Sequence, residues 1–212
     1  MRNPDPDWEI YIEQFIPRLD PLLDELENYT RWHTPYPQML SGKWQAAFLH
    51  FLVRLKQPRH VLEIGTFTGY ATLAMAQALP DGSKIITLEN HPENLSIARR
   101  FFRKSKFGHK IEAVETQAPD WLSRNNEKYD LVFLDADKEN YPLYYQIIKK
   151  RLNPGAWWIT DNVLWNGKVL NPGRDPQARA IAAFNESMRR DPQLETMLIP
   201  LRDGLLWTVY RP

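Results

Sequence analysis

The 212-residue sequence contains no cysteine, so disulfide bonds and thiolate metal sites are excluded. Charge of one sign is not in surplus either. The sequence has 27 basic side chains against 26 acidic ones, which disfavours nucleic acid or a membrane surface as a partner. Apolar runs stay well below the roughly 20 residues that span a membrane. The chain does not start with the basic and apolar regions of a signal peptide, and we therefore expect a cytoplasmic protein.

What the sequence does contain is an alternation of strands and helices. With 43% hydrophobic residues, it is long enough for one sizeable α/β domain. From residue 58 onward, short β-rich runs alternate with helical stretches, which predicts a doubly wound, mostly parallel sheet. The strands are predicted at 60–64, 84–88, 111–115, 130–134, 156–160, 194–200 and 205–210. The last two surround Arg202-Asp203-Gly204 and predict an antiparallel hairpin at the C-terminus.

Helices are predicted before the sheet and between its strands. Residues 8–32 carry apolar side chains on one helical face, but Pro17 and Pro21 divide them into two short helices. The other helices are predicted at 41–56, with Ser41 as the N-cap, and at 70–79, 92–104, 119–124, 141–152 and 179–190.

The remaining segments complete the expected organisation of a single domain, 1–212. Asn153-Pro154-Gly155 is predicted to be a turn, and the polar residues 166–176 form a loop long enough to act as a lid. We expect residues 1–57 to cover the ligand cleft or to form a dimer face, and residues 58–212 to form the catalytic core.

Two predicted strands end in polar residues. The run 130–134 stops at Asp135, and the run 156–160 stops at Asp161 and Asn162. Ligands of open α/β sheets bind outside the carboxyl ends of the strands. If the two strands are neighbours, Asp135, Asp161 and Asn162 converge and offer only hard oxygen ligands, which suit Mg²⁺, Mn²⁺ or Ca²⁺. The alternative is that these side chains cap the helices that follow.

A glycine-containing loop follows the first strand of the predicted core. Gly65 and Gly69 allow the backbone to turn tightly and to approach a ligand between strand and helix. Glu89 ends the next strand, where a carboxylate can accept hydrogen bonds from the ribose hydroxyls of an adenosine ligand. The loop lacks the glycine pattern of dinucleotide sites and the lysine of a P-loop, so phosphate is disfavoured and S-adenosyl-methionine fits better. The alternative is an ordinary structural turn.

Three stretches resemble a known family. VLEIGTFTGYATLAMAQALP, YDLVFLDADKENY and ITDNVLWNGKV are similar to the cation-dependent O-methyltransferases that act on catechols and caffeoyl-coenzyme A, and the similarity covers about residues 38–170. The resemblance implies a class I methyltransferase (Rossmann-like) fold, S-adenosyl-methionine as methyl donor, and a divalent metal held by Asp135, Asp161 and Asn162. It implies Lys138 and Asp135 as catalytic residues. The cofactor contacts that it implies are Met39, Glu63, Gly65, Gly69, Tyr70, Thr72, Glu89, Ala118 and Asp135.

The chain departs from the family's pattern at three places. Ala71, followed by Thr72, stands where a serine is common. Ser41-Gly42-Lys43-Trp44-Gln45-Ala46 replaces Ser-Pro-Glu-Gln-Gly-Gln, and Gly155-Ala156-Trp157-Trp158 replaces a plainer strand entry. None of these departures replaces a predicted metal ligand.

The predicted chemistry is methyl transfer to a hydroxyl of a catechol-type small molecule, by a chain that we expect to form a homodimer. A phenol with a pKa near 10 is mostly protonated at neutral pH, and bound Mg²⁺ would stabilise the oxyanion and orient both oxygens of a vicinal diol. Lys138 could then accept the proton, or it could be a solvated lysine at a helix start. Trp165 could stack on an aromatic acceptor, or it could pack in the core.

Other functions stay open on the same residues. A methyltransferase for a modified tRNA uridine would use the same fold, and a catalytically silent S-adenosyl-methionine-binding protein would keep the cofactor site. A nicotinamide-dependent oxidoreductase is disfavoured because the glycine spacing does not match.

Overall fold

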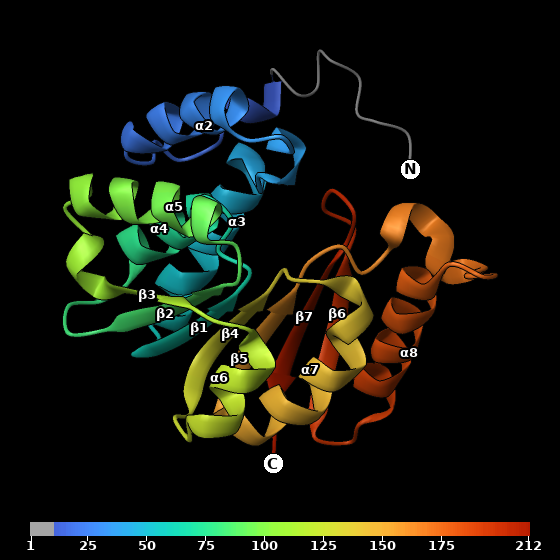
Figure 1. Ribbon diagram of the computed structural model, residues 1–212. Helices are drawn as coiled ribbons and strands as arrows, with labels where there is room; N and C mark the ends of the chain where they lie inside the picture. Colours follow the sequence, from blue (N-terminus) through green and yellow to red (C-terminus); the bar gives the residue numbers. More distant parts are fainter. Residues whose placement is uncertain (1–10) are drawn as a thin grey trace.

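A seven-stranded sheet forms the centre of the computed structural model, which describes residues 11–212 (Figure 1). Its strand order is β3-β2-β1-β4-β5-β7-β6. The first five strands in this order are parallel, whereas β7 runs antiparallel to both β5 and β6. The strands are β1 His60–Ile64, β2 Lys84–Glu89, β3 Ile111–Glu115, β4 Tyr129–Leu134, β5 Leu152–Thr160, β6 Leu194–Ile199 and β7 Leu205–Tyr210. The predicted doubly wound sheet with a C-terminal hairpin is confirmed.

Helices cover both faces of this sheet (Figure 1). They are α2 Leu22–His33, α3 Gly42–Lys56, α4 Tyr70–Ala78, α5 Pro92–Lys104, α6 Ala118–Arg124, α7 Tyr141–Ile148 and α8 Pro176–Arg190. Short 3-10 turns link them at η1 Pro37–Met39, η2 Gly108–Lys110, η3 Lys138–Asn140, η4 Lys149–Arg151 and η5 Trp165–Leu170. Between residues 11 and 212, no helix is both long and apolar enough to cross a membrane.

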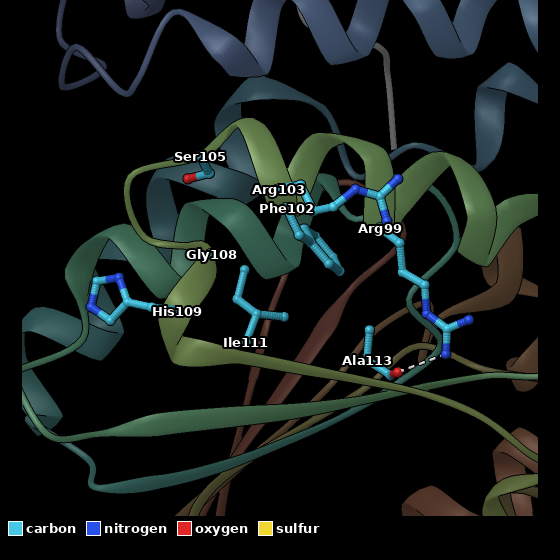
Figure 2. Close-up of a pocket in the computed structure, with 8 residues that line it drawn as sticks. All are labelled: Arg99, Phe102, Arg103, Ser105, Gly108, His109, Ile111 and Ala113. Atoms are coloured by element: carbon cyan, nitrogen blue, oxygen red, sulfur yellow. Dashed lines mark hydrogen bonds between the residues drawn. The ribbon is translucent and has the colours of Figure 1, made fainter.

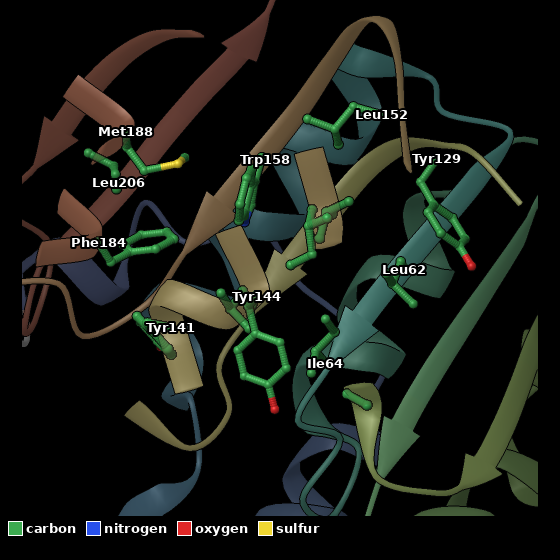
Figure 3. Close-up of a cluster of buried hydrophobic side chains, with 14 of the residues drawn as sticks. Leu62, Ile64, Tyr129, Tyr141, Tyr144, Leu152, Trp158, Phe184, Met188 and Leu206 are labelled. Atoms are coloured by element: carbon green, nitrogen blue, oxygen red, sulfur yellow. The ribbon is translucent and has the colours of Figure 1, made fainter. Parts of the chain in front are cut away.

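Alternation along the strands explains why both faces are covered. In β4, Leu131 and Phe133 point to a core shared with α3 and α4, whereas Val132 and Leu134 point to a core shared with α6, α7 and α8. Figure 3 shows the second core, where the buried Trp158 of β5 contacts Phe184 of α8 at a ring separation of 5.7 Å. A strand that is apolar on both faces has to be buried on both faces.

Four local predictions need correction or adjustment. Asn153-Pro154-Gly155 is not a separate turn, because β5 already begins at Leu152 and the residues form an irregularity in its pairing with β4. Gly155 accommodates that irregularity with a φ of 74°. Ser41 precedes α3, but its side chain makes no capping hydrogen bond, and its φ and ψ of −58° and −28° are already helical.

The other two adjustments concern the predicted lid and the N-terminal helices. The segment 166–176 is shorter as a loop than predicted, because η5 runs to Leu170 and α8 begins at Pro176. Asp175 caps α8 by accepting hydrogen bonds from the amides of Gln177 and Ala178, both at 3.0 Å. Of the predicted helices in 8–32, the second is α2, and residues 8–10 lie outside the described part of the chain.

Candidate functional site

Four of the predicted site residues follow strand ends that lie in one line across the sheet. The pairing register aligns Leu88, Ile64, Leu134 and Thr160, the residues that end or nearly end β2, β1, β4 and β5. The next residues along these strands are Glu89, Gly65, Asp135 and Asp161. Because all four strands are parallel, these residues share the carboxyl edge of the sheet. Strand order reverses between β1 and β4, which is the place where ligands bind in such sheets.

Asp135 and Asp161 lie on neighbouring strand ends. The Asp161 amide donates to the carbonyl oxygen of Leu134 at 2.9 Å, and the Asp135 amide donates to the carbonyl oxygen of Ile64 at the same distance. The Asp161 side chain is buried, with 2% of its surface exposed. Burial, and then the nearby charge of Asp135, raise the pKa of Asp161 to about 7. Burial and the charge of Asp135 thus disfavour the charged form of Asp161, and a bound cation would favour it.

Asn162 completes the predicted ligand set. It follows Asp161 directly and has a φ of 58°, in the left-handed region that asparagine tolerates better than most residues. Its backbone amide donates to Oδ1 of Asp161 at 2.7 Å. Within 11–212, no group of three or more His, Cys, Asp or Glu side chains that could hold a metal is found. The predicted set differs from such a group in having two carboxylates and one amide, and those hard oxygens fit Mg²⁺.

Lys138 lies at the start of η3 and is buried against this pair. Its Nζ donates to Oδ1 of Asp135 at 2.7 Å and to the hydroxyl of Tyr141 at 2.8 Å. Burial by itself lowers the pKa of the Lys138 amine, but the charge of Asp135 and the hydrogen bonds to Asp135 and Tyr141 outweigh it and raise the pKa above its ordinary value. Lys138 is thus a charged donor beside Asp135 and is not a solvated surface lysine.

Tyr141 is a member of this site that sequence reasoning missed. Its hydroxyl accepts from Lys138 and donates to the carbonyl oxygen of Asp161 at 2.9 Å. The ring is fully buried against Phe184, at a centroid separation of 5.2 Å (Figure 3). One signal was present in the sequence, since Tyr141 follows Lys138 by three residues, a spacing that brings side chains together on a helix.

Gln45 and Arg202 are two further residues that were not predicted. Gln45 is buried in α3, and its Nε2 donates to Oδ2 of Asp161 at 2.6 Å. Arg202, in the turn between β6 and β7, donates from Nη1 to Oε1 of Gln45 at 3.1 Å. The signal for Gln45 was a polar residue on the apolar face of a helix, in line with Leu49 and Leu52.

Glu63 lies inside the sheet, two residues before the first glycine of the loop. Its Oε2 accepts hydrogen bonds from the hydroxyls of Thr72 and Thr87, the latter at 2.5 Å. Its Oε1 is buried and has no hydrogen-bond partner among residues 11–212. Burial raises the pKa of Glu63 to about 8, although the two threonine hydroxyls oppose this shift. A buried acceptor without a partner is suited to a donor group from a ligand.

The glycine loop has the backbone that its sequence predicted. Gly65 and Gly69 have φ values of 99° and 90°, which glycine adopts without strain. A Cβ on Gly69 would come within 2.5 Å of the Phe102 ring, so this glycine is also needed for packing against α5. Tyr70 and Thr72 begin α4 directly after the loop, and both are buried.

Glu89 binds the loop through its carboxylate. Oε2 accepts from the Phe67 amide at 2.7 Å, and Oε1 accepts from the amides of Asn90 and His91, both at 3.0 Å. A carboxylate oxygen can accept more than one hydrogen bond, so these contacts orient Glu89 and leave acceptor capacity for hydroxyl donors.

The other three predicted residues lie in the helical segments η1, α6 and η5. Ala118 is buried at the start of α6. Met39, in η1, is 56% exposed. Trp165 is half-buried at the start of η5, where it packs against the core shared with α6, α7 and α8. Trp165 therefore packs against the core, which was one of the two predictions for this residue.

A cavity of about 330 Å³ lies away from these residues, beside α5, η2 and β3 (Figure 2). Its lining includes Arg99, Arg103, His109 and Ile111. Arg99 is turned inward and donates to the carbonyl oxygen of Ala113 at 3.0 Å (Figure 2). None of the predicted site residues lines this cavity.

Known proteins resemble this chain over nearly its whole length. A family model described as O-methyltransferase matches residues 15–210. Caffeoyl-CoA O-methyltransferase 5 of Nicotiana tabacum is 33% identical over 202 residues, covering 89% of this chain and 84% of the relative. A caffeoyl-CoA O-methyltransferase of Petroselinum crispum is also 33% identical, covering 89% and 83%.

Solved structures agree with the sequence comparison. The O-methyltransferase from Bacillus cereus in complex with SAH superposes with a TM-score of 0.90 at 28% identity, covering 97% of each chain. The O-methyltransferase TomG from Streptomyces achromogenes, in complex with SAM, has a TM-score of 0.89 at 26% identity, covering 97% of this chain and 96% of that chain.

Proposed function

Because this chain belongs to the O-methyltransferase family, we propose that it transfers a methyl group from S-adenosyl-methionine to a hydroxyl of a catechol-type small molecule, assisted by a divalent metal. The relatives from Nicotiana tabacum and Petroselinum crispum are caffeoyl-CoA O-methyltransferases, whose name implies an aromatic acceptor of this class. The proposal goes beyond the family in two respects, namely the metal and the vicinal diol.

The observation that carries this proposal is the adjacency of Asp135 and Asp161 on paired strand ends, with Lys138 hydrogen-bonded between Asp135 and Tyr141. Two carboxylates and an amide at one sheet edge are a donor set for a hard cation. The same edge carries Gly65 and Glu89, so methyl donor and acceptor would meet there. Transfer from a sulfonium requires this proximity, because the acceptor oxygen has to be close and aligned.

The donor half of the site would be formed by the residues around β1 and β2. Glu89 would hold the ribose hydroxyls through the remaining acceptor capacity of its carboxylate. Oε1 of Glu63, which has no hydrogen-bond partner in the described part of the chain, would accept from the ammonium end of the cofactor, directly or through water. Gly65, Gly69, Tyr70, Thr72 and Ala118 would form the wall against which the cofactor lies, and Met39 would close it from η1.

The acceptor half would be formed at β4 and β5. Asp135, Asp161 and Asn162 would hold the metal, which would lower the pKa of the reacting hydroxyl and orient both oxygens of a vicinal diol. Lys138 would hold the reacting oxygen by donating from Nζ, and in its neutral form, after loss of its own proton, it would take up the proton of the hydroxyl at Nζ. Because Asp135 raises the pKa of Lys138, this role requires that the charge of Asp135 be engaged elsewhere. Trp165 would border the acceptor while it packs against the core.

The test is methyl transfer from labelled S-adenosyl-methionine to caffeic acid and to caffeoyl-coenzyme A, with Mg²⁺ and with EDTA. We expect turnover that EDTA removes and Mg²⁺ restores. Turnover that EDTA does not change would contradict the metal-dependent mechanism, but it would still support methyltransferase activity. Bound cofactor without turnover on either acceptor would favour another substrate, such as a modified tRNA uridine, or a silent binding protein.

We also propose that the chain forms a homodimer through α3. Trp44, Phe48, Phe51 and Leu55 follow one another at helical spacing, and Phe51 and Leu55 are 51% and 70% exposed. A second copy is the occupant that the family resemblance predicts. Sedimentation should give a dimer for the native chain and a monomer for the double variant Phe51→Glu and Leu55→Glu. Lys128→Glu, exposed elsewhere, should remain dimeric, and a native monomer would overturn the proposal.

A further inference from the structure

A chain of side-chain hydrogen bonds leads from the C-terminal hairpin to the predicted metal ligand. Arg202 donates to Oε1 of Gln45 at 3.1 Å, and Nε2 of Gln45 donates to Oδ2 of Asp161 at 2.6 Å. We propose that Gln45 is a positioning residue for Asp161, and that Arg202 acts through Gln45 by holding its amide in the required orientation. This inference rests on the proposed function, because it concerns the role of Asp161 as a metal ligand.

The chemistry of the three side chains determines which atom of Gln45 faces Arg202 and which faces Asp161. A carboxylate accepts hydrogen bonds and a guanidinium donates them, so an amide between the two satisfies both neighbours in one orientation alone. Oε1 has to face Arg202, and Nε2 has to face Asp161. A glutamate at position 45 would lack the donor, and an aliphatic residue would lack both groups. The structure thus selects an amide at this point of α3.

Burial strengthens the hydrogen bonds that hold the Gln45 amide in this orientation. Gln45 is fully buried, and Asp161 is 2% exposed, so bulk water does not compete for these bonds. Hydrogen bonds to a charged acceptor are shorter and stronger than neutral ones, which agrees with the 2.6 Å between Gln45 and Asp161. Oδ1 of Asp161 accepts from the Asn162 amide at 2.7 Å. The plane of the carboxylate is therefore held from both of its oxygens.

The same hairpin turn also holds the segment that follows Asp161 and Asn162. The amide of Val163 donates to the carbonyl oxygen of Gly204 at 3.1 Å, and the amide of Leu164 donates to the carbonyl oxygen of Asp203 at 2.9 Å. Arg202 itself has a φ of 52°, an unfavourable backbone for a residue with a side chain. Its guanidinium also donates to the carbonyl oxygens of Ser41 and Leu40, the latter at 3.3 Å. The turn therefore contacts the segment that follows Asp161 and Asn162 as well as the residues that precede α3.

A purely structural role would predict a different result from a positioning role. If Arg202 merely anchors residues 40–41 to the hairpin, its removal lowers stability and leaves the metal affinity as it was. If it acts through Gln45, its removal lowers the metal affinity, and it has no further effect once Gln45 is gone. Outer contacts that orient a ligand typically change metal affinity 10–100-fold.

The experiment measures Mn²⁺ binding to the full chain by calorimetry, without acceptor, for Gln45→Leu, Arg202→Met and the double variant. We expect Gln45→Leu to weaken binding about 10–100-fold and Arg202→Met to weaken it less. The double variant should bind as Gln45→Leu does. Asp161→Ala measures the background from other sites, and Gln146→Leu, exposed on α7, is the matched control with native affinity. S-adenosyl-methionine binding and thermal unfolding report on the fold of each variant.

The outcomes separate this proposal from the one on which it rests. A native chain that binds no Mn²⁺ above the Asp161→Ala background would overturn the metal site and the positioning role with it. A native chain that binds, with a folded Gln45→Leu variant of equal affinity, would overturn the positioning role alone. Additive losses in the double variant would show that Arg202 does not act through Gln45. If Gln45→Leu does not fold, an Arg202→Met variant with native Mn²⁺ affinity would overturn the proposal that Arg202 acts on Asp161 through Gln45.

Discussion

Gly65 lies directly against the main-chain carbonyl group of Asp135. A Cβ on Gly65 would come within 2.0 Å of that carbonyl oxygen and 2.7 Å of its carbon, closer than real side chains approach. The glycine that follows β1 is therefore what allows the end of β4, with Asp135, to reach its observed position. The glycine loop and the proposed metal ligands therefore meet at this contact.

Gly65→Ala should for this reason be more damaging than a substitution at a glycine with positive φ and open space around it. Positive φ alone costs an alanine about 1–2 kcal/mol, and the contact with Asp135 adds a backbone displacement. Gly82→Ala is the matched control, because Gly82 has a φ of 75° and no atom within 4 Å of its would-be Cβ. In urea titrations, Gly65→Ala should lose at least about 2 kcal/mol more unfolding free energy than Gly82→Ala. Equal losses would contradict the role of the contact.

Asp161→Ala should abolish metal-dependent turnover and leave S-adenosyl-methionine binding largely intact. In the proposed site, Asp161 would belong to the acceptor half, whereas Glu63, Glu89 and the glycine loop would form the donor half. Turnover and cofactor affinity are measured separately, with Asp120→Ala, an exposed carboxylate on α6, as the control. Equal loss of turnover and cofactor binding would show that the metal has been assigned to the wrong residues.

Lys138→Met should lower kcat by roughly 10²–10⁴-fold, the range expected for loss of a positioned proton acceptor. Tyr141→Phe removes one hydrogen bond to Lys138 and the bond to the Asp161 carbonyl, so its kcat should fall by a smaller factor, about tenfold. Cofactor affinity should stay near the native value in both. Lys128→Met, which alters an exposed lysine, is the control. Native kcat in Lys138→Met would exclude the proposed role.

Glu63 should make the stability of the cofactor-free protein decrease with pH. Its pKa is about 8 in the folded chain against 4.5 as an ordinary glutamate, so between these values the folded state holds a proton that the unfolded state releases. The unfolding free energy therefore falls as pH rises from about 4.5 to about 8, and this contribution is constant outside that window. A tenfold difference in proton affinity between the folded and unfolded states corresponds to about 1.4 kcal/mol, so the fall is on the order of a few kcal/mol.

Glu63→Gln is the comparison for this pH dependence. Its side chain does not titrate and can still accept from Thr72 and Thr87 through its amide oxygen. Chemical unfolding at several pH values from 4 to 9 should give a flatter profile for the variant. Parallel profiles for the variant and the native chain would mean that Glu63 does not titrate in this range.

Much of the fold could be predicted because it depends on local patterns. Strands β1, β3 and β7 have the predicted ends, since runs of apolar, β-branched residues bounded by Gly, Pro or charged residues are readable along the chain. The irregular start of β5 could not be read in this way. Asn153 there donates to Oδ1 of Asp130 on the neighbouring strand, and that contact holds an otherwise turn-like segment in the sheet.

The sequence by itself determined the order of strands and helices, the two acidic strand ends and the glycine loop, because each is a short-range pattern. Only the tertiary structure decided which distant side chains support them. Gln45 and Asp161 are 116 residues apart in sequence, and Arg202 and Gln45 are 157 apart. No spacing rule connects such residues, since their contact depends on how α3 and the C-terminal hairpin pack at the carboxyl edge of the sheet. This packing places Gln45 beside the proposed metal ligand Asp161 and places Arg202 beside Gln45, and the burial of Gln45 and Asp161 shields the hydrogen bond between them from water.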